Sequence, residues 1–109
     1  MRRLELIQLI GDVLTQLDVL RGSLLPGDPN RTVLDQLRDE LDAQQLKLAQ
    51  NEFDDNTAAF VDVTEKLVAI NKDMSLTLKS IDKLVTTIDN LKRFVGAVND
   101  IVGIALPFL

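Results

Sequence analysis

The sequence predicts an all-α protein, an antiparallel helical bundle that ends in a long heptad-patterned helix. Glycine and proline are scarce, with five and three in 109 residues, and the aromatic residues are four phenylalanines. The apolar residues instead recur at steps of three and four, which is the period of a helix. Apolar residues make up 46% of the chain and charged residues 27%, as in ordinary globular proteins. We therefore expect a single helical domain over residues 1–109.

The first predicted helix covers residues 3–24. Proline cannot continue the helical hydrogen bonds, so Pro26, followed by Gly27, ends it. The apolar stripe of this helix consists of Leu4, Ile7, Ile10, Val13, Leu14, Leu17, Leu20 and Leu24.

The second predicted helix covers residues 29–52. Asp28 is a typical N-cap, and Pro29 fits the first helical position, where its missing N–H costs nothing. Gln44 and Gln45 fall near the middle of the apolar face, so we expect looser packing there. This face consists of Val33, Leu34, Leu37, Leu41, Leu46, Leu48, Ala49 and Phe53. Asp, Asn and Thr residues at 51–57 favour a turn, since they compete for backbone hydrogen bonds. The alternative is one uninterrupted helix through this segment.

The third predicted helix covers residues 57–104 and carries a heptad repeat. The repeat consists of Phe60, Val63, Leu67, Ile70, Met74, Ile81, Leu84, Ile88, Leu91, Val95, Val98 and Val102. Only Thr77 departs from it, so a break at 74–77 would give four helices instead of three. We favour a continuous helix because no glycine or proline lies there. Such a helix is about 70 Å long, against about 33 Å for each of the first two.

The C-terminal half of this helix is the main candidate interaction surface. A coiled-coil dimer usually carries charges beside its seam, but Val85, Phe94 and Ile101 occupy those flanking positions. The stripe is therefore wide enough for a bundle of three or more helices. Three uses remain open: an intramolecular core, a seam between copies of the chain, and a groove for a partner's helix.

The last residues of the chain lack polar side chains after Asp100. This segment either folds back onto the core, forms the centre of an oligomer or docks in a partner, or touches a membrane surface; we rank membrane contact last. Even when it is counted from Phe94, the segment 94–109 is too short to span a bilayer. The candidate interaction residues are Ile81, Leu84, Ile88, Leu91, Phe94, Val95, Val98, Ile101, Val102, Leu106 and Phe108.

Charge is distributed unevenly along the chain, whose net charge is −5. Residues 35–65 hold nine acidic and two basic residues, whereas residues 66–100 hold four acidic and six basic residues. Asp39, Glu40 and Asp42 form a candidate acidic surface for a basic partner, with a solvated helix face as the plain alternative. No basic stripe of the kind that binds nucleic acids is present, so we expect no nucleic-acid partner.

The composition argues against an enzyme. Histidine and cysteine are both absent, which removes the commonest general base, the thiolate nucleophile and the usual transition-metal ligands. We expect no catalytic residue, no cofactor and no metal site. Glu5 and Asp12 interrupt the apolar run that a signal peptide needs, and we expect a cytoplasmic protein.

These observations predict a non-enzymatic helical protein–protein interaction module: an adaptor, a chaperone-like protein or an immunity-type binder. Its partner is another protein or a second copy of itself. The alternative is a self-assembling structural or membrane-active component that uses the apolar C-terminal helix.

Overall fold

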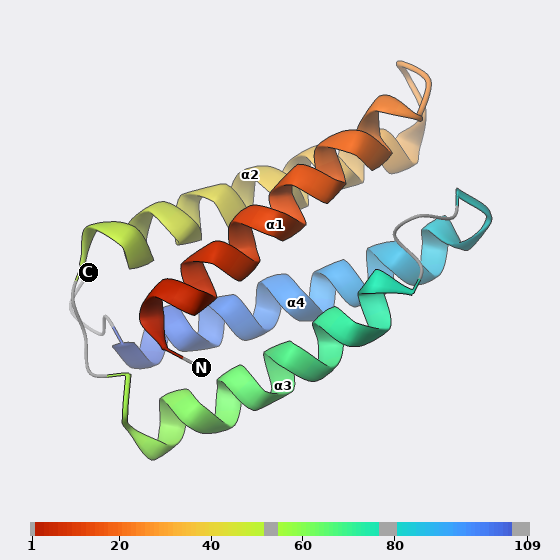
Figure 1. Ribbon diagram of the computed structural model, residues 1–109. Helices are drawn as coiled ribbons and strands as arrows, with labels where there is room; N and C mark the ends of the chain where they lie inside the picture. The colour runs from red at the N-terminus through yellow and green to blue at the C-terminus, as the bar shows by residue number, and fades with distance from the viewer. Residues whose placement is uncertain (1, 52–54, 77–80, 106–109) are drawn as a thin grey trace.

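The computed structural model describes residues 2–51, 55–76 and 81–105, and over these ranges its secondary structure is helical. The helices are α1 (Arg3–Gly22), α2 (Pro29–Gln50), α3 (Ala58–Ser75) and α4 (Leu84–Ala105), with a short 3-10 turn, η1 (Ile81–Lys83), before α4. They form two antiparallel hairpins, α1–α2 and α3–α4, stacked on each other (Figure 1). The predicted all-α helical bundle is confirmed.

In the first hairpin, both helices begin and end within two residues of their predicted positions. In the turn, Gly27 has φ 91°, a left-handed conformation that residues with a Cβ rarely adopt. The Asp28 Oδ1 atom then accepts a hydrogen bond from the Asn30 backbone N–H at 2.9 Å, which caps α2. Helix α1 ends two residues earlier than predicted, and so does α2.

The predicted turn between the second and third helices is confirmed. The backbone of Asn51 is extended, with φ −125° and ψ 134°, so α2 ends there. Thr57 is the N-cap of α3, and its hydroxyl oxygen accepts from the Phe60 N–H at 3.3 Å. The alternative of one uninterrupted helix is therefore wrong, because α2 ends at Gln50 and α3 begins at Ala58.

The prediction of one continuous helix over 57–104 is wrong. Helix α3 ends at Ser75, and α4 returns antiparallel beside it after η1 (Figure 1). The four helices contain 20, 22, 18 and 22 residues, so each covers its neighbours along nearly its whole length. A straight helix would have left half of the heptad stripe without a partner, and burial of that stripe outweighs the cost of a break. Thr77, where the repeat fails, lies outside the described residues.

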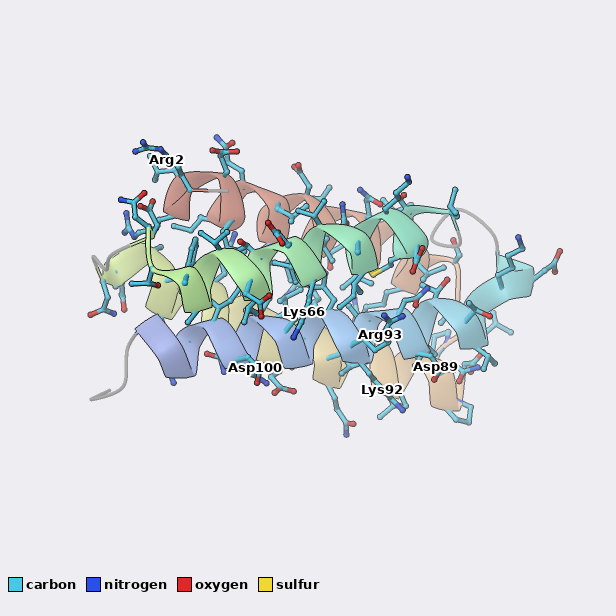
Figure 2. The ribbon with its side chains drawn as sticks, turned by 90° about the horizontal axis from the view of Figure 1, so that it is seen from below. Arg2, Lys66, Asp89, Lys92, Arg93 and Asp100 are labelled. Atoms are coloured by element: carbon cyan, nitrogen blue, oxygen red, sulfur yellow. The ribbon has the colours of Figure 1, made fainter. Side chains whose placement is uncertain are left out.

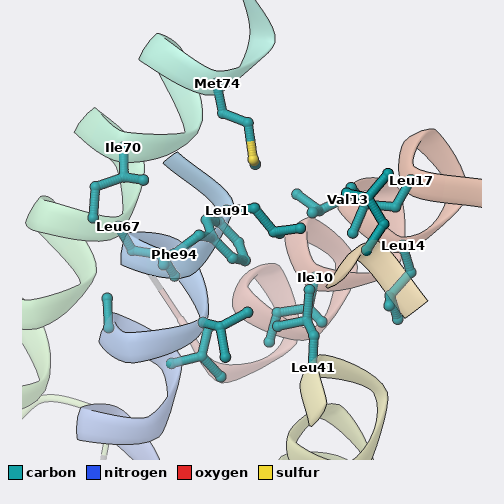
Figure 3. Close-up of a cluster of buried hydrophobic side chains, with 14 of the residues drawn as sticks. Ile10, Val13, Leu14, Leu17, Leu41, Leu67, Ile70, Met74, Leu91 and Phe94 are labelled. Atoms are coloured by element: carbon teal, nitrogen blue, oxygen red, sulfur yellow. The ribbon is translucent and has the colours of Figure 1, made fainter. Parts of the chain in front are cut away.

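The core is a single cluster to which all four helices contribute. Its centre contains Ile10, Val13, Leu14 and Leu17 of α1, Leu41 of α2, Leu67, Ile70 and Met74 of α3, and Leu91 and Phe94 of α4 (Figure 3). Helix α4 packs on both α3 and α2, whereas α1 packs mainly on α2. This double packing explains why the apolar stripe of α4 is wider than that of a simple coiled coil.

Parts of the predicted apolar faces are wrong. Leu4 is 66% exposed, Leu46 57% and Val85 69%, and Ala49 is exposed as well, although all four were assigned to apolar stripes. Leu6, which precedes Ile10 by one turn, is fully buried in place of Leu4. In α1 and in α2 two leucines stand two residues apart, Leu4 and Leu6 or Leu46 and Leu48, and periodicity alone could not decide which of the two faces inward.

Candidate functional site

Most of the candidate interaction residues lie in the core. Leu84, Ile88, Leu91, Phe94, Val95, Val98 and Ile101 are at most 8% exposed, and Val102 is half-buried. The side chain of Ile81, together with Leu106 and Phe108, lies outside the described part of the chain. Of the three uses considered for this stripe, the packing corresponds to an intramolecular core. A second role in contacting a partner stays a prediction.

The predicted acidic surface divides between two sides of α2. Asp39, Glu40 and Asp42 are all exposed. The Glu40 Oε1 atom accepts a hydrogen bond from the Asn99 side-chain amide of α4 at 2.8 Å, so Glu40 lies at the α2–α4 seam. Asp39 and Asp42 lie instead toward α1, where their charges raise the pKa of Arg38, after the larger effect of Asp18. The three carboxylates are therefore two surfaces and not one.

Two ion pairs cross the α1–α2 seam near Asp39. The Arg38 guanidinium binds Asp18 through two hydrogen bonds, of 2.5 Å from Nε and 3.2 Å from Nη2, and Arg21 pairs with Asp35. These five residues line a shallow depression of about 380 Å³. The hydrogen bond from Arg38 lowers the pKa of Asp18 from its ordinary value of 3.8, and desolvation opposes this shift. Both arginines of the depression are thus neutralised, while Asp39 adds a further negative charge.

An arginine that sequence reasoning missed fastens the other end of this hairpin. Arg3 Nε donates to the backbone oxygens of Leu48 at 3.1 Å and Asn51 at 2.9 Å, and Nη2 donates to that of Ala49 at 2.9 Å. Its backbone N–H also donates to Asp55 Oδ2 at 2.9 Å. The backbone oxygens of Leu48, Ala49 and Asn51 lie at the C-terminal end of α2, where no later N–H of the helix can bond them. The Arg3 guanidinium satisfies them instead, and its positive charge interacts favourably with the negative end of the helix dipole. No local pattern signals a contact over 45 residues.

The two glutamines that interrupt the apolar face of α2 have different environments. Gln45 faces α1, where its Nε2 donates to the Ile7 carbonyl oxygen at 3.1 Å. Gln44 is one residue earlier, about 100° around the helix, and therefore faces away from α1 toward α4. Its Oε1 atom is shielded from solvent and has no hydrogen-bond partner among the described residues, and the same holds for Asn99 Oδ1. The interruption visible in the sequence therefore marks a polar seam.

The outer face of α4 carries charges of both signs. Asp89, Lys92, Arg93 and Asp100 are exposed along it (Figure 2). The large hydrophobic residues that remain exposed are distributed over all four helices and the first turn: Leu4, Val19, Leu25, Leu46, Val61, Val68, Leu76 and Val85. Singly exposed apolar residues are normal on soluble surfaces and do not define a site.

Two kinds of feature are absent from the part of the chain that the structure describes. No group of three histidine, cysteine, aspartate or glutamate residues there is placed to hold a metal ion. No helix in that part of the chain combines the length and the apolar character needed to cross a membrane.

Comparison with known proteins gave no relatives. A scan against protein-family models found no match, and neither did searches of curated proteins and of solved structures.

Proposed function

We propose that this protein is a non-enzymatic helical binding module that captures a partner protein through a basic surface of that partner. The observation that carries the proposal is the contrast between an enclosed apolar core and an exposed acidic surface. The apolar heptad stripe is enclosed by the chain's own helices, while the acidic side chains of α2 point outward. Such a surface suits recognition by charge, because complementary potentials steer two proteins together and reject partners of the wrong sign.

Asp39 and Asp42 are the strongest candidates for this steering. Both are exposed, and neither forms an ion pair among the described residues. Beside them, Asp18 neutralises Arg38 and Asp35 neutralises Arg21, so nearby positive charge does not cancel the two carboxylates. A lysine or arginine of a partner can approach them without breaking an existing pair.

A charge-reversal experiment tests the proposal. Wild type and the double variant Asp39→Lys, Asp42→Lys are immobilised and exposed to an extract of the cells in which the protein naturally occurs. The control is Asp89→Lys, Asp100→Lys, which makes the same change of net charge on the outer face of α4. We expect a basic protein that binds wild type and the α4 control but is lost from the α2 variant. Equal capture by both variants would reject the α2 surface.

Light scattering over a dilution series separates this proposal from the self-assembling alternative. The binding module is expected at the chain's mass of 12.1 kDa at every concentration. A discrete oligomer that persists on dilution would favour self-assembly, in which the C-terminal segment or an exposed helix face joins copies of the chain.

A further inference from the structure

The α2–α4 seam places three acceptor groups together. Glu40 Oε1 accepts from Asn99 Nδ2 at 2.8 Å, which fixes Asn99 against α2. Gln44 follows Glu40 by four residues, so their side chains lie on the same face of α2, about one turn apart. Asn99 Oδ1 and Gln44 Oε1 are both shielded from solvent and have no donor among the described residues. Glu40 and Asn99 are thus in contact where α2 packs on α4, and Gln44 lies about one turn further along the same face of α2.

Such a set of acceptors fits a donor with several N–H bonds. A buried oxygen without a hydrogen bond is destabilising relative to a satisfied one. The three oxygens cannot satisfy one another, because an amide oxygen carries no proton and a carboxylate only accepts. Ammonium and guanidinium groups are pure donors with three and five N–H bonds, and their positive charge also suits Glu40.

We propose that the α2–α4 seam at Glu40, Gln44 and Asn99 is a binding site for a lysine or arginine side chain of the partner. The cationic group pairs with the exposed Glu40 carboxylate and donates hydrogen bonds to both amide oxygens. This inference rests on the proposed function, since it assigns the partner's basic residue a place on the protein. It adds a second point of attachment, on the opposite side of α2 from Asp39 and Asp42.

The surroundings leave room for the approach of such a group. Glu40 is exposed, and Gln44 and Asn99 are half-exposed as whole residues although their oxygens are covered. Gly103 lies one turn beyond Asn99 on α4 and is exposed, and among the described residues no atom outside its own stretch of helix lies within 4 Å of where a Cβ would stand. The terminal torsion of Gln44 is broad, so turning its oxygen toward the cation costs little. Asn99 turns its carboxamide as the cation replaces its Nδ2 as the donor to Glu40, so Glu40 keeps a hydrogen bond.

The test uses small cations as probes and the side-chain amide signals of isotopically labelled protein as the readout. Methylammonium and guanidinium chloride are titrated separately, well below denaturing concentrations, and tetramethylammonium chloride is the control because it has the same charge but no N–H donor. We expect saturable shifts of the Gln44 and Asn99 amide signals with one or both donors. Gln45, already bonded to the Ile7 carbonyl oxygen, should not shift.

A variant supplies the second control. Glu40→Gln removes the charge but keeps the shape, and should weaken donor binding about tenfold, the difference between a charge-assisted and a neutral hydrogen bond. The site is overturned if tetramethylammonium shifts the same signals equally, if no donor gives saturable shifts, or if Glu40→Gln changes nothing. Failure of the proposed function is distinct, because it appears in the capture experiment while the cation titration is unaffected.

Discussion

The two hairpins of this bundle are held together by different forces. In α1–α2, two ion pairs, the Gln45–Ile7 hydrogen bond and the Arg3 guanidinium all connect residues of different helices or their ends. In the described part of α3–α4, the polar side-chain bonds of Thr64 and Arg93 stay within one helix, and that of Asn99 crosses to α2 instead of α3.

The difference shows that the two hairpins of one small protein rely on different kinds of interaction. The second hairpin has the more extensive helix contact and relies on apolar burial, which is strong but not directional. The first hairpin adds directional bonds, which fix the register of its helices and leave charged groups at the surface. The polar and acidic features proposed to bind a partner accordingly lie on α2, with Asn99 of α4 beside them.

The largest expected effect is in the apolar hairpin. Phe94 of α4 is fully buried at the centre of the core. Phe94→Ala should lower the free energy of unfolding by about 3–5 kcal/mol, because it removes apolar contacts and leaves a cavity. Urea denaturation followed by circular dichroism measures the change. Val85→Ala, on a side chain that is 69% exposed, is the control and should alter stability by less than about 0.5 kcal/mol. Similar losses for both would mean that α4 does not pack as described.

The Arg3 contact should give the next largest effect and is particular to the polar hairpin. Arg3→Ala removes three side-chain hydrogen bonds from the end of α2 and should cost about 1.5–3 kcal/mol. Arg2→Ala changes the net charge equally but removes an exposed side chain next to it. Denaturant midpoints of the two variants measure the difference, and equal midpoints would show that only net charge matters.

A pair of threonines compares satisfied and unsatisfied hydroxyls in the second hairpin. Thr87 is fully buried and its hydroxyl has no partner in the part of the chain that the structure describes, whereas the Thr64 hydroxyl, also buried, donates to Val61 O at 2.9 Å. Thr87→Val should raise the melting temperature, with a gain of about 1 kcal/mol, because it replaces an unpaired polar group by one of the same shape. Thr64→Val loses a bond and should lower it. A loss in both variants would place a partner on Thr87.

Two glycines sharpen the comparison at the level of the backbone. A Cβ on Gly96 of α4 meets no atom of the described residues within 4 Å apart from its own stretch of helix, so Gly96→Ala should stabilise the protein by about 0.5–1 kcal/mol through helix propensity. A Cβ on Gly11 of α1 would lie 3.2 Å from Gln45 Nε2, which bonds Ile7. Gly11→Ala should therefore gain less or lose stability. Equal rises in the melting temperatures of the two variants would mean that the α1–α2 seam accommodates the added methyl group at Gly11.

Much of the fold could be predicted from the sequence because its signals are local. The Asp28–Pro29 start, the Gly27 turn and the Thr57 cap each act within a few residues. The break between α3 and α4 could not be predicted in this way, since neither glycine nor proline lies at 74–77 and the stripe continues on both sides. Only the gain from packing α4 back onto α3 decides it, and that gain depends on the whole tertiary structure.

The candidate site shows the same limit. Periodicity identified the residues of α4 that share one face, but the same pattern serves a core, an oligomer seam or a groove. The charge count found an acidic segment, yet it could not show that Glu40 lies on the other side of α2 from Asp39 and Asp42. Arg3, Gln44 and Asn99 act through contacts between distant segments, so their roles require the three-dimensional arrangement.

The smallest expected effect concerns acid. The pKa of Asp18 is lowered in the folded protein by its hydrogen bond from Arg38, so the folded state binds this proton less readily than the unfolded state. The contribution of the pair is therefore present above the ordinary value of 3.8 and is lost as the pH falls below it, through the lowered pKa. Asp18 is about half exposed, and solvent screening limits the effect to under about 1 kcal/mol. Comparing urea midpoints of wild type and Asp18→Asn at pH 6 and at pH 2–3 (roughly the window that the linkage defines) measures it. The two curves should differ at the higher pH and converge at the lower one. A constant difference would show that Asp18 acts through packing, and the α1–α2 hairpin would then owe less to charge than its ion pairs indicate.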